Sequence, residues 1–129
     1  MSTEENKRLL RTAYTGEGDG PDLLTLLADD ATYTFFGEHS LAKTFAGKQA
    51  IIEGLFTSIA ETLEDGIKLE IHNMIAEGDQ VVFEAYGTAR TKEGVDYNNT
   101  YCMVVRMRDG QIASVREYLD TGLVSRVFG

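Results

Sequence analysis

One carboxylate, Glu117, stands out because its neighbours of the same parity along the chain, Val115 and Leu119, are apolar. Residues Gln111 to Asp120 have the pattern of a strand, and alternation places these three side chains on one face. A carboxyl group on an apolar face loses hydration, which raises its pKa towards neutrality. Such a group can remove a proton from a carbon next to a carbonyl, so the sequence predicts Glu117 as the catalytic acid/base. The structural alternatives are an ion pair with a basic side chain such as Arg11, or solvation at the edge of the fold.

Further residues on the neighbouring strands are expected to bind the same ligand. Tyr33, Tyr101 and Asn99 carry groups that can hydrogen-bond to a carbonyl oxygen. Apolar side chains would complete the wall of a pocket, and we expect them to be Phe35, Phe83, Met103, Val115 and Leu119. The competing interpretation of each tyrosine is a core side chain whose hydroxyl is satisfied within the protein.

Other kinds of site find little support in the sequence. The two histidines, His39 and His72, lie outside any metal-binding spacing, and no glycine-rich phosphate-binding motif follows a strand. With a net charge of −9 and no basic cluster, the chain should repel nucleic acid. We therefore expect no metal, no cofactor and no nucleic acid.

The composition favours one cytoplasmic domain without a membrane segment. A chain of 129 residues suits a single domain, residues 1–129, with one core. No apolar run approaches the roughly 20 residues that span a bilayer, and the acidic N-terminus differs from a secretory signal. The single cysteine, Cys102, allows no internal disulfide and is expected to be a small buried residue.

The first half of the chain predicts three helices and one strand. Ser2 and Glu5 have the spacing of a capping box for a helix from Ser2 to Tyr14. Pro21 should begin a second helix that ends at Asp29-Asp30, with Leu23, Leu24, Leu26 and Leu27 buried. A strand from Ala31 to Phe36 and an irregular loop from Gly37 to Gly47 follow. The third helix, from about Lys48 to Leu63, should bury the apolar stripe Ile51, Ile52, Leu55, Phe56 and Ile59.

The second half predicts a meander of four strands. Their expected ranges are Ile67 to Ala76, Val81 to Arg90, Tyr97 to Arg108 and Gln111 to Asp120. Asp109-Gly110 between the last two strands is a strong hairpin signal. A short helix capped by Asp120 should close the chain near Val127. This order of elements predicts an α+β fold, in which three helices cover one face of a curved antiparallel sheet and enclose an apolar cone.

Four segments in this order resemble the nuclear transport factor 2-like superfamily, and the SnoaL-like and ketosteroid-isomerase-like proteins are the most similar branches. The segments are LLTLLADDATY (23–33), GKQAIIE (47–53), AEGDQVV (76–82) and RDGQI…VREYLDT (108–121). The resemblance implies a cone-shaped barrel of cystatin-like type, a small apolar ligand inside it and, often, a homodimer through the outer face of the sheet. Outward residues such as Val104, Arg106, Arg116 and Tyr118 suit such an interface.

The catalytic sets known in this superfamily carry over only in part. Where ketosteroid isomerases place a general-base Asp and an oxyanion-hole acid, this chain has Phe35 and Met103, and their helix Tyr falls near Arg11. Limonene-epoxide-hydrolase relatives share Tyr33 and an acid at Glu117, but Phe35, Ala85 and Gly87 replace their other polar residues. Both mechanisms are therefore disfavoured.

Three interpretations remain open. SnoaL-like polyketide cyclases use an acidic residue in the pocket, and Glu117 fits that role, so a cofactor-independent cyclase or isomerase that acts on an apolar carbonyl compound is one hypothesis. A non-catalytic ligand-binding or dimeric scaffold domain is the second, and an assembly domain that binds a protein partner through the sheet is the third. An enclosed pocket with Glu117 beside a hydroxyl favours the enzyme, whereas a pocket filled by Phe35 and Met103 favours the scaffold.

Overall fold

Local sequence signals set the ends of the first helix in the computed structural model, which describes residues 1–129. Helix α1 (Thr3–Thr15) begins at Ser2, whose hydroxyl accepts a hydrogen bond from the backbone N–H of Glu5 at 3.1 Å. It ends at Gly16, which has a left-handed φ of 78°. The capping signal at Ser2 is therefore confirmed.

The second helix is shorter than predicted. Helix α2 spans only Leu23–Leu26, and strand β1 (Leu27–Phe35) begins directly after it, so that Asp29 and Asp30 lie exposed within the strand. Leu27 already pairs with Ile112 of strand β6, which draws the chain into the sheet. Leu24, expected in the core, is 40% exposed because one turn of helix cannot bury a face on all sides.

The predicted third helix is one helical run of three parts, α3 (Lys48–Ala50), the π-helical segment η1 (Ile51–Phe56) and α4 (Thr57–Thr62). Ile52 from its apolar stripe is exposed, because the wider π-helical turn rotates the stripe. A short strand that the sequence did not predict, β2 (Thr44–Ala46), precedes the run and pairs with β1.

The predicted meander is confirmed, with strands β3 (Lys68–Glu77), β4 (Gln80–Thr88), β5 (Thr100–Arg108) and β6 (Gln111–Leu119). Asp109 and Gly110 adopt φ values of 52° and 77°, as a tight hairpin turn requires. Helix α5 (Thr121–Phe128) follows, capped by the carboxylate of Asp120.

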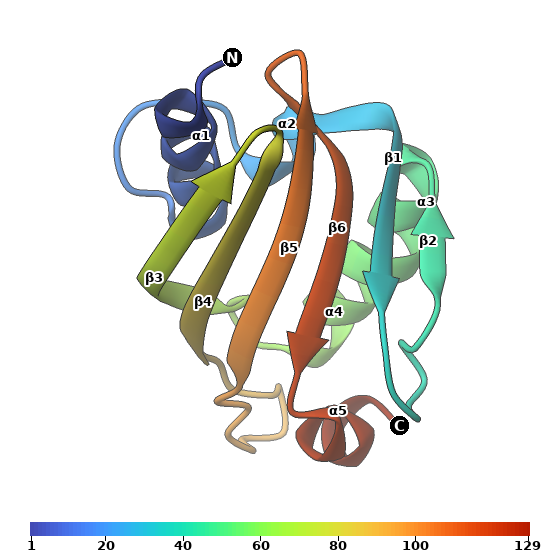
Figure 1. Cartoon of the computed structure of the whole chain (residues 1–129). Helices are drawn as coiled ribbons and strands as arrows, with labels where there is room; N and C mark the ends of the chain where they lie inside the picture. The colour runs from blue at the N-terminus through green and yellow to red at the C-terminus, as the bar shows by residue number, and fades with distance from the viewer.

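The six strands form one curved sheet in the order β2-β1-β6-β5-β4-β3 (Figure 1). Helices α1, α2, α3 and α4 cover its rear face in that view, and α5 lies at its lower end. The predicted α+β class is thus confirmed. The sheet has one parallel pair, β1 with β6, among its otherwise antiparallel neighbours.

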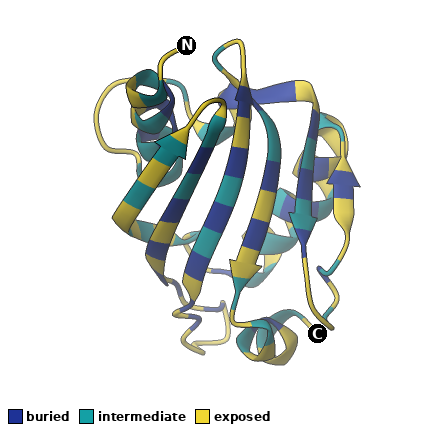
Figure 2. Cartoon of the chain, viewed as in Figure 1, coloured by how far each residue is buried: buried dark blue, intermediate teal, exposed yellow.

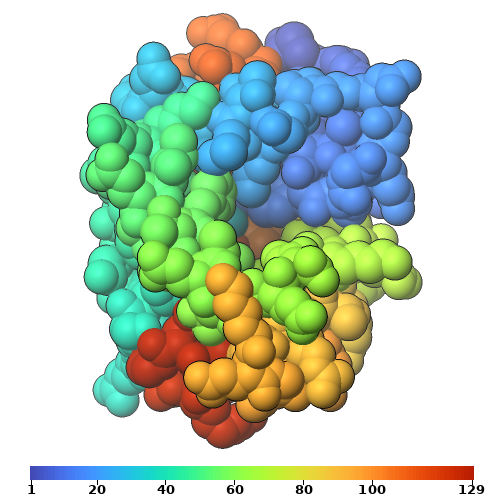
Figure 3. Space-filling model, turned by 180° about the vertical axis from the view of Figure 1, so that it is seen from behind, coloured from blue at the N-terminus to red at the C-terminus, as the bar shows by residue number.

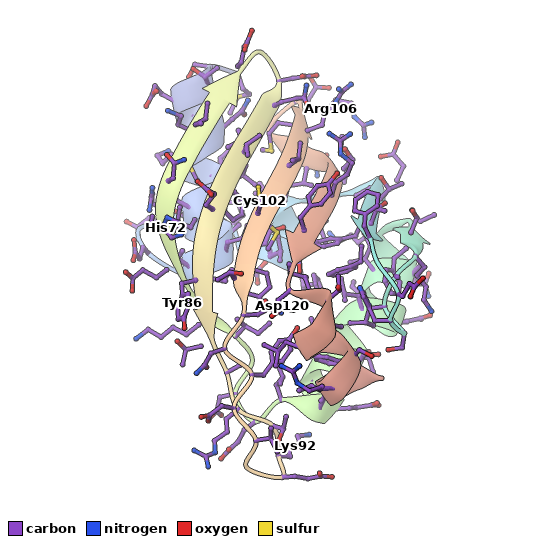
Figure 4. The ribbon with its side chains drawn as sticks, turned by 60° about the horizontal axis from the view of Figure 1, so that its bottom comes forward. His72, Tyr86, Lys92, Cys102, Arg106 and Asp120 are labelled. Carbon is purple, nitrogen blue, oxygen red and sulfur yellow. The ribbon has the colours of Figure 1, made fainter.

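The two faces of the sheet differ in burial, as alternation along the strands requires. Figure 2 shows buried and more exposed residues in turn along β4, β5 and β6. The inward face joins a core of 25 apolar residues. Tyr86 and Arg106 lie on the outward face with Cys102, which is only half-buried rather than a core residue (Figure 4). No helix has the length and apolar character needed to cross a membrane.

Candidate functional site

Glu117 lies on the inward face of β6, as its parity predicted, with only 6% of its surface exposed. The neighbouring strands hold it in register, since Glu117 pairs with Phe35 of β1 on one side and with Met103 of β5 on the other. None of the four ion pairs of the structure involves it. The predicted alternatives, an ion pair with Arg11 or a solvated edge position, are therefore wrong.

A chain of two tyrosine hydroxyls leads to this carboxylate. Tyr33 donates a hydrogen bond to Glu117 Oε1 at 2.7 Å, and the hydroxyls of Tyr14 and Tyr33 are 3.1 Å apart. Each hydroxyl has a single proton, so when Tyr33 donates to an ionised Glu117 the donor of the second bond must be Tyr14. Neither tyrosine then has a proton left for a ligand. Met103 Sδ lies 3.8 Å from the Tyr33 hydroxyl as a weaker acceptor.

The second carboxylate oxygen, Oε2, is the one left for chemistry. It receives no hydrogen bond from the protein, and it is not among the fully inaccessible polar atoms that lack a partner. Because Glu117 also lines a cavity, Oε2 is the oxygen available to a ligand there.

Burial dominates the electrostatics of the site. Loss of hydration raises the pKa of Glu117 from 4.5 to about 7, and the hydrogen bond from Tyr33 opposes that rise. Burial, followed by the negative charge of Glu117, raises the pKa of Tyr33 well above its ordinary value. Tyr33 therefore stays protonated, while Glu117 can both accept and return a proton near neutral pH.

An apolar cavity of about 210 Å³ lies between the sheet and the helices. Figure 3 shows the molecule hollowed on the side away from the sheet, between the N-terminal segment in blue, the helical run 48–62 in green and the start of β3 in yellow-green. Five predicted site residues line this cavity, Tyr33, Phe35, Tyr101, Met103 and Glu117. Phe35 and Met103 thus form part of its wall and leave it open.

Tyr101 differs from the other tyrosines because its hydroxyl is buried and has no hydrogen-bond partner. Burial, followed by the neighbouring Tyr97, raises the pKa of this hydroxyl, so it remains a donor. Tyr97 lies nearby without forming a hydrogen bond of ordinary geometry with it. A buried polar group without a partner costs roughly 1–3 kcal/mol, which a ligand oxygen would recover. The ring has room because position 87 on β4 is a glycine, where an added Cβ would lie 2.5 Å from Tyr101 Cε2.

Four predicted residues lie outside the main cavity. Leu119 lines a second, smaller cavity on the other side of Glu117. Phe83 and Val115 are completely buried and line neither cavity, and Phe83 packs edge-on against Tyr14 at 5.0 Å.

Asn99 is the fourth, and its expected place in the pocket is wrong. Its side chain ties β5 to the end of β6, because its oxygen accepts from the backbone N–H groups of Thr100 and Asp120 at 2.8 and 3.0 Å. Its amide group donates to the Asp120 carbonyl and to the Tyr97 hydroxyl, each at 3.3 Å. With every polar atom engaged in the fold, it has nothing left for a ligand.

Tyr14 is the site residue that the sequence missed. It appeared only as the last residue of the first predicted helix, and nothing in its local pattern shows that it reaches Tyr33 on β1. His39, by contrast, contacts only its own loop. Its Nδ1 accepts a hydrogen bond from the Leu41 N–H, and its Nε2 lies 2.9 Å from the Phe36 carbonyl oxygen. No group of three or more His, Cys, Asp or Glu side chains is placed to hold a metal ion.

Known proteins of similar sequence and structure share this architecture. The profile of the SnoaL-like domain matches residues 7–115, whereas no curated protein matches the chain. A nuclear transport factor 2-like protein from Burkholderia xenovorans LB400 is 29% identical, with a TM-score of 0.77 over 100% of this chain and 99% of the other.

Two further solved structures share the fold at lower identity. A putative SnoaL-like polyketide cyclase from Jannaschia sp. CCS1 is 19% identical, with a TM-score of 0.75 over 98% of this chain and 92% of the other. A protein with a ketosteroid isomerase-like fold from Catenulispora acidiphila DSM 44928, in complex with trimethylamine, is 25% identical, with a TM-score of 0.72 over 99% and 95% of the two chains. Since the domain profile spans most of the sequence and the fold agrees throughout, the chain belongs to the SnoaL-like family of the nuclear transport factor 2-like fold.

Proposed function

We propose that the protein is a cofactor-independent cyclase or isomerase that transfers protons on a small apolar carbonyl compound, with Glu117 as the acid/base. The observation that carries this proposal is the state of the Glu117 carboxylate. It is buried beside an apolar cavity, Tyr33 engages its Oε1, and its Oε2 receives no hydrogen bond. Similarity to a putative polyketide cyclase supports the same reaction class.

The proposed reaction begins when Oε2 takes a proton from the carbon next to the ligand carbonyl. The electrons of that C–H bond form the enolate, and the negative charge moves to the carbonyl oxygen. The hydroxyl of Tyr101 donates a hydrogen bond to that oxygen, because it is the cavity hydroxyl without a partner. The role of oxygen binding, expected for Tyr33 as well, therefore falls to Tyr101 alone.

Glu117 then returns its proton to complete the reaction. In an isomerisation the proton goes to a different carbon of the same molecule. In a ring closure the enolate carbon attacks a second carbonyl, and the new alkoxide takes the proton. Both outcomes conserve the proton and need no redox partner, so they suit a carboxyl group whose pKa is about 7.

The test is deuterium exchange at the α-carbon of a simple phenyl ketone in D₂O, followed by proton NMR. Protein-dependent exchange should rise with pH through about 7 and then level off, because ionised Glu117 is the base. Glu117→Gln should slow it by about 100-fold or more. The exposed Glu77→Gln, on the end of β3, is the matched control and should leave the rate unchanged. Ketone binding without any exchange above background would favour the non-catalytic ligand-binding domain.

We also propose that two copies of the chain associate through the outward face of the sheet in the cytoplasm. Tyr118 of β6 stacks on Phe36 with ring centroids 4.8 Å apart, although the residues remain 45% and 41% exposed. Tyr86 and Ile75 on the same face are also exposed, at 50% and 60%. Burial of these side chains against a second copy would remove apolar surface from water.

A further inference from the structure

Two cavities meet at the proposed reaction centre. The smaller one has a volume of about 20 Å³ and shares six lining residues with the main cavity, Glu117 and Tyr101 among them. The carboxylate and the partnerless hydroxyl therefore lie, with four apolar side chains, at the boundary between a large apolar space and a small one. A carbonyl group bound to Tyr101 would present one of its two substituents to each space.

The small cavity is closed by the C-terminal helix. Val124 and Phe128 of α5 line it, and the Phe128 ring packs edge-on against Tyr97 at 5.3 Å. The end of α5 is fastened to the loop before β2, because the Ser40 N–H donates to the Gly129 carbonyl at 2.6 Å and the Ser40 hydroxyl donates to the Phe128 carbonyl at 3.1 Å. Enlarging the cavity would require these contacts to break.

The size and lining of the small cavity define what can enter. A volume of about 20 Å³ holds one small group, about the size of a water molecule or a methyl group. Leu41, Leu119, Val124 and Phe128 supply hydrocarbon walls. In the unliganded protein a water could find polar partners here, because the hydroxyls of Tyr97 and Tyr101 and Oε2 of Glu117 belong to residues of the lining. A bound ketone would take the Tyr101 hydroxyl through its carbonyl oxygen and Oε2 through its α-carbon. The rest of the lining is hydrocarbon, so with the ketone bound it favours an apolar group.

Building on the proposed function, we propose that the substrates are ketones with a methyl-sized group on one side of the carbonyl and a larger apolar group on the other. The methyl-sized group enters the small cavity beneath α5, and the larger group fills the main cavity. Phe128 is then a specificity-determining residue, which limits the length of the smaller substituent without touching the reacting atoms.

The experiment measures binding of phenyl ketones that carry a methyl, ethyl or propyl group, by NMR titration of the folded protein. Without a steric limit, each added methylene would tighten binding roughly fourfold through apolar burial. We expect the opposite order, with the propyl ketone binding at least tenfold more weakly than the methyl ketone. Tighter binding of the longer ketones, or no binding of any of the three, would overturn the proposal.

Two variants enlarge the small cavity from opposite sides. Phe128→Ala shortens the closing side chain, and Leu41→Ala opens the wall formed by the loop before β2. In either variant the propyl ketone should bind at least as tightly as the methyl ketone. Leu41→Ala leaves α5 intact, so it still tests the proposal if the loss of Phe128 loosens the helix. Val95→Ala, which shortens an exposed apolar side chain outside both cavities, should preserve the order of the unmodified protein.

Binding and turnover separate this inference from the proposed function. A preference for methyl ketones that both variants abolish supports the small cavity as the specificity site, even if no α-proton exchanges. If exchange depends on Glu117 but the order of ketone affinities is the same in both variants as in the unmodified protein, the reaction class stands and the assignment of the small cavity is wrong.

Discussion

The energetic cost of Glu117 can be measured without any ligand. Burial raises its pKa from 4.5 to about 7, so between these pH values the native state holds a proton that the unfolded chain has lost. The contribution of Glu117 to stability is therefore greatest below about pH 4.5 and falls as pH rises to about 7. Above that pH the ionised carboxylate destabilises the fold by about 3 kcal/mol.

Glu117→Gln removes this cost, so the variant should be more stable than the unmodified protein at pH 8, by about 2–3 kcal/mol. At pH 5 the gain should shrink to less than about 1 kcal/mol, because native Glu117 is already protonated there. Urea denaturation at the two pH values measures the difference, with Glu77→Gln as a control that should show no such dependence. An equal gain at both pH values would mean that Glu117 has an ordinary pKa.

The hydroxyl chain should tune the same pKa from a distance. The hydrogen bond from Tyr33 stabilises the ionised form of Glu117, so Tyr33→Phe should raise the Glu117 pKa above 7. Tyr14→Phe should raise it by a smaller amount, because Tyr14 acts only by donating to Tyr33. Carbon NMR titration of labelled Glu side chains reports both changes. Tyr86→Phe, on the outer face of the sheet, is the control.

Residue patterns identified the acid of this site and the tyrosines Tyr33 and Tyr101, but not the contact that Tyr14 makes. Glu117 was found because strand alternation is a local rule that assigned its face correctly. Tyr14 was missed because its contact with Tyr33 depends on where α1 crosses the sheet, which no local pattern records. Asn99 was misassigned for a related reason, since its partner Asp120 lies 21 positions away.

At the scale of elements, β4 makes room for the tyrosine that β5 presents to the cavity. The ring of Tyr101 occupies the space in which any larger residue at position 87 of β4 would place its Cβ. Any larger residue at this position would collide with Tyr101, so Gly87 is what allows Tyr101 to occupy its place in the cavity wall.

Gly87→Ala should displace the Tyr101 ring and lower the affinity for ketones by about tenfold, at a cost of about 1–3 kcal/mol in stability. Urea denaturation and the NMR titration measure the two effects separately. In the double variant Gly87→Ala, Tyr101→Leu the clash is relieved, so stability should recover while affinity stays low. Unchanged ketone binding in Gly87→Ala would show that the position of Tyr101 does not matter.

The prediction of helices and strands succeeded where the signal was local, and it failed where pairing between distant strands determines the structure. The Ser2 cap, the Asp109-Gly110 hairpin and the Asp120 cap were all confirmed. Strand β2 was missed because its three residues are held by pairing with β1 rather than by their own pattern. The early start of β1 at Leu27 likewise depends on a contact with Ile112.

At the scale of the whole molecule, the outward face of the sheet predicts self-association. Analytical ultracentrifugation should show a dimer, and Tyr118→Glu should shift it to a monomer because a charge would be buried at the interface. Val95→Glu adds the same charge at an exposed apolar position in the loop between β4 and β5, and should leave the dimer intact. A monomeric unmodified protein, or dissociation of the Val95 variant as well, would contradict this interface.

The parallel seam between β1 and β6 has a consequence for the order in which the chain folds. Strands β3 to β6 pair with sequence neighbours, but the Tyr33–Glu117 hydrogen bond closes a loop of 84 positions. Long loops are closed late, so the meander can assemble before β1 arrives, and the pocket exists only after this last closure. Any fluctuation that detaches β1 would erase the site while most of the sheet survives. A bound ligand should therefore slow hydrogen exchange in β1 more than in β4.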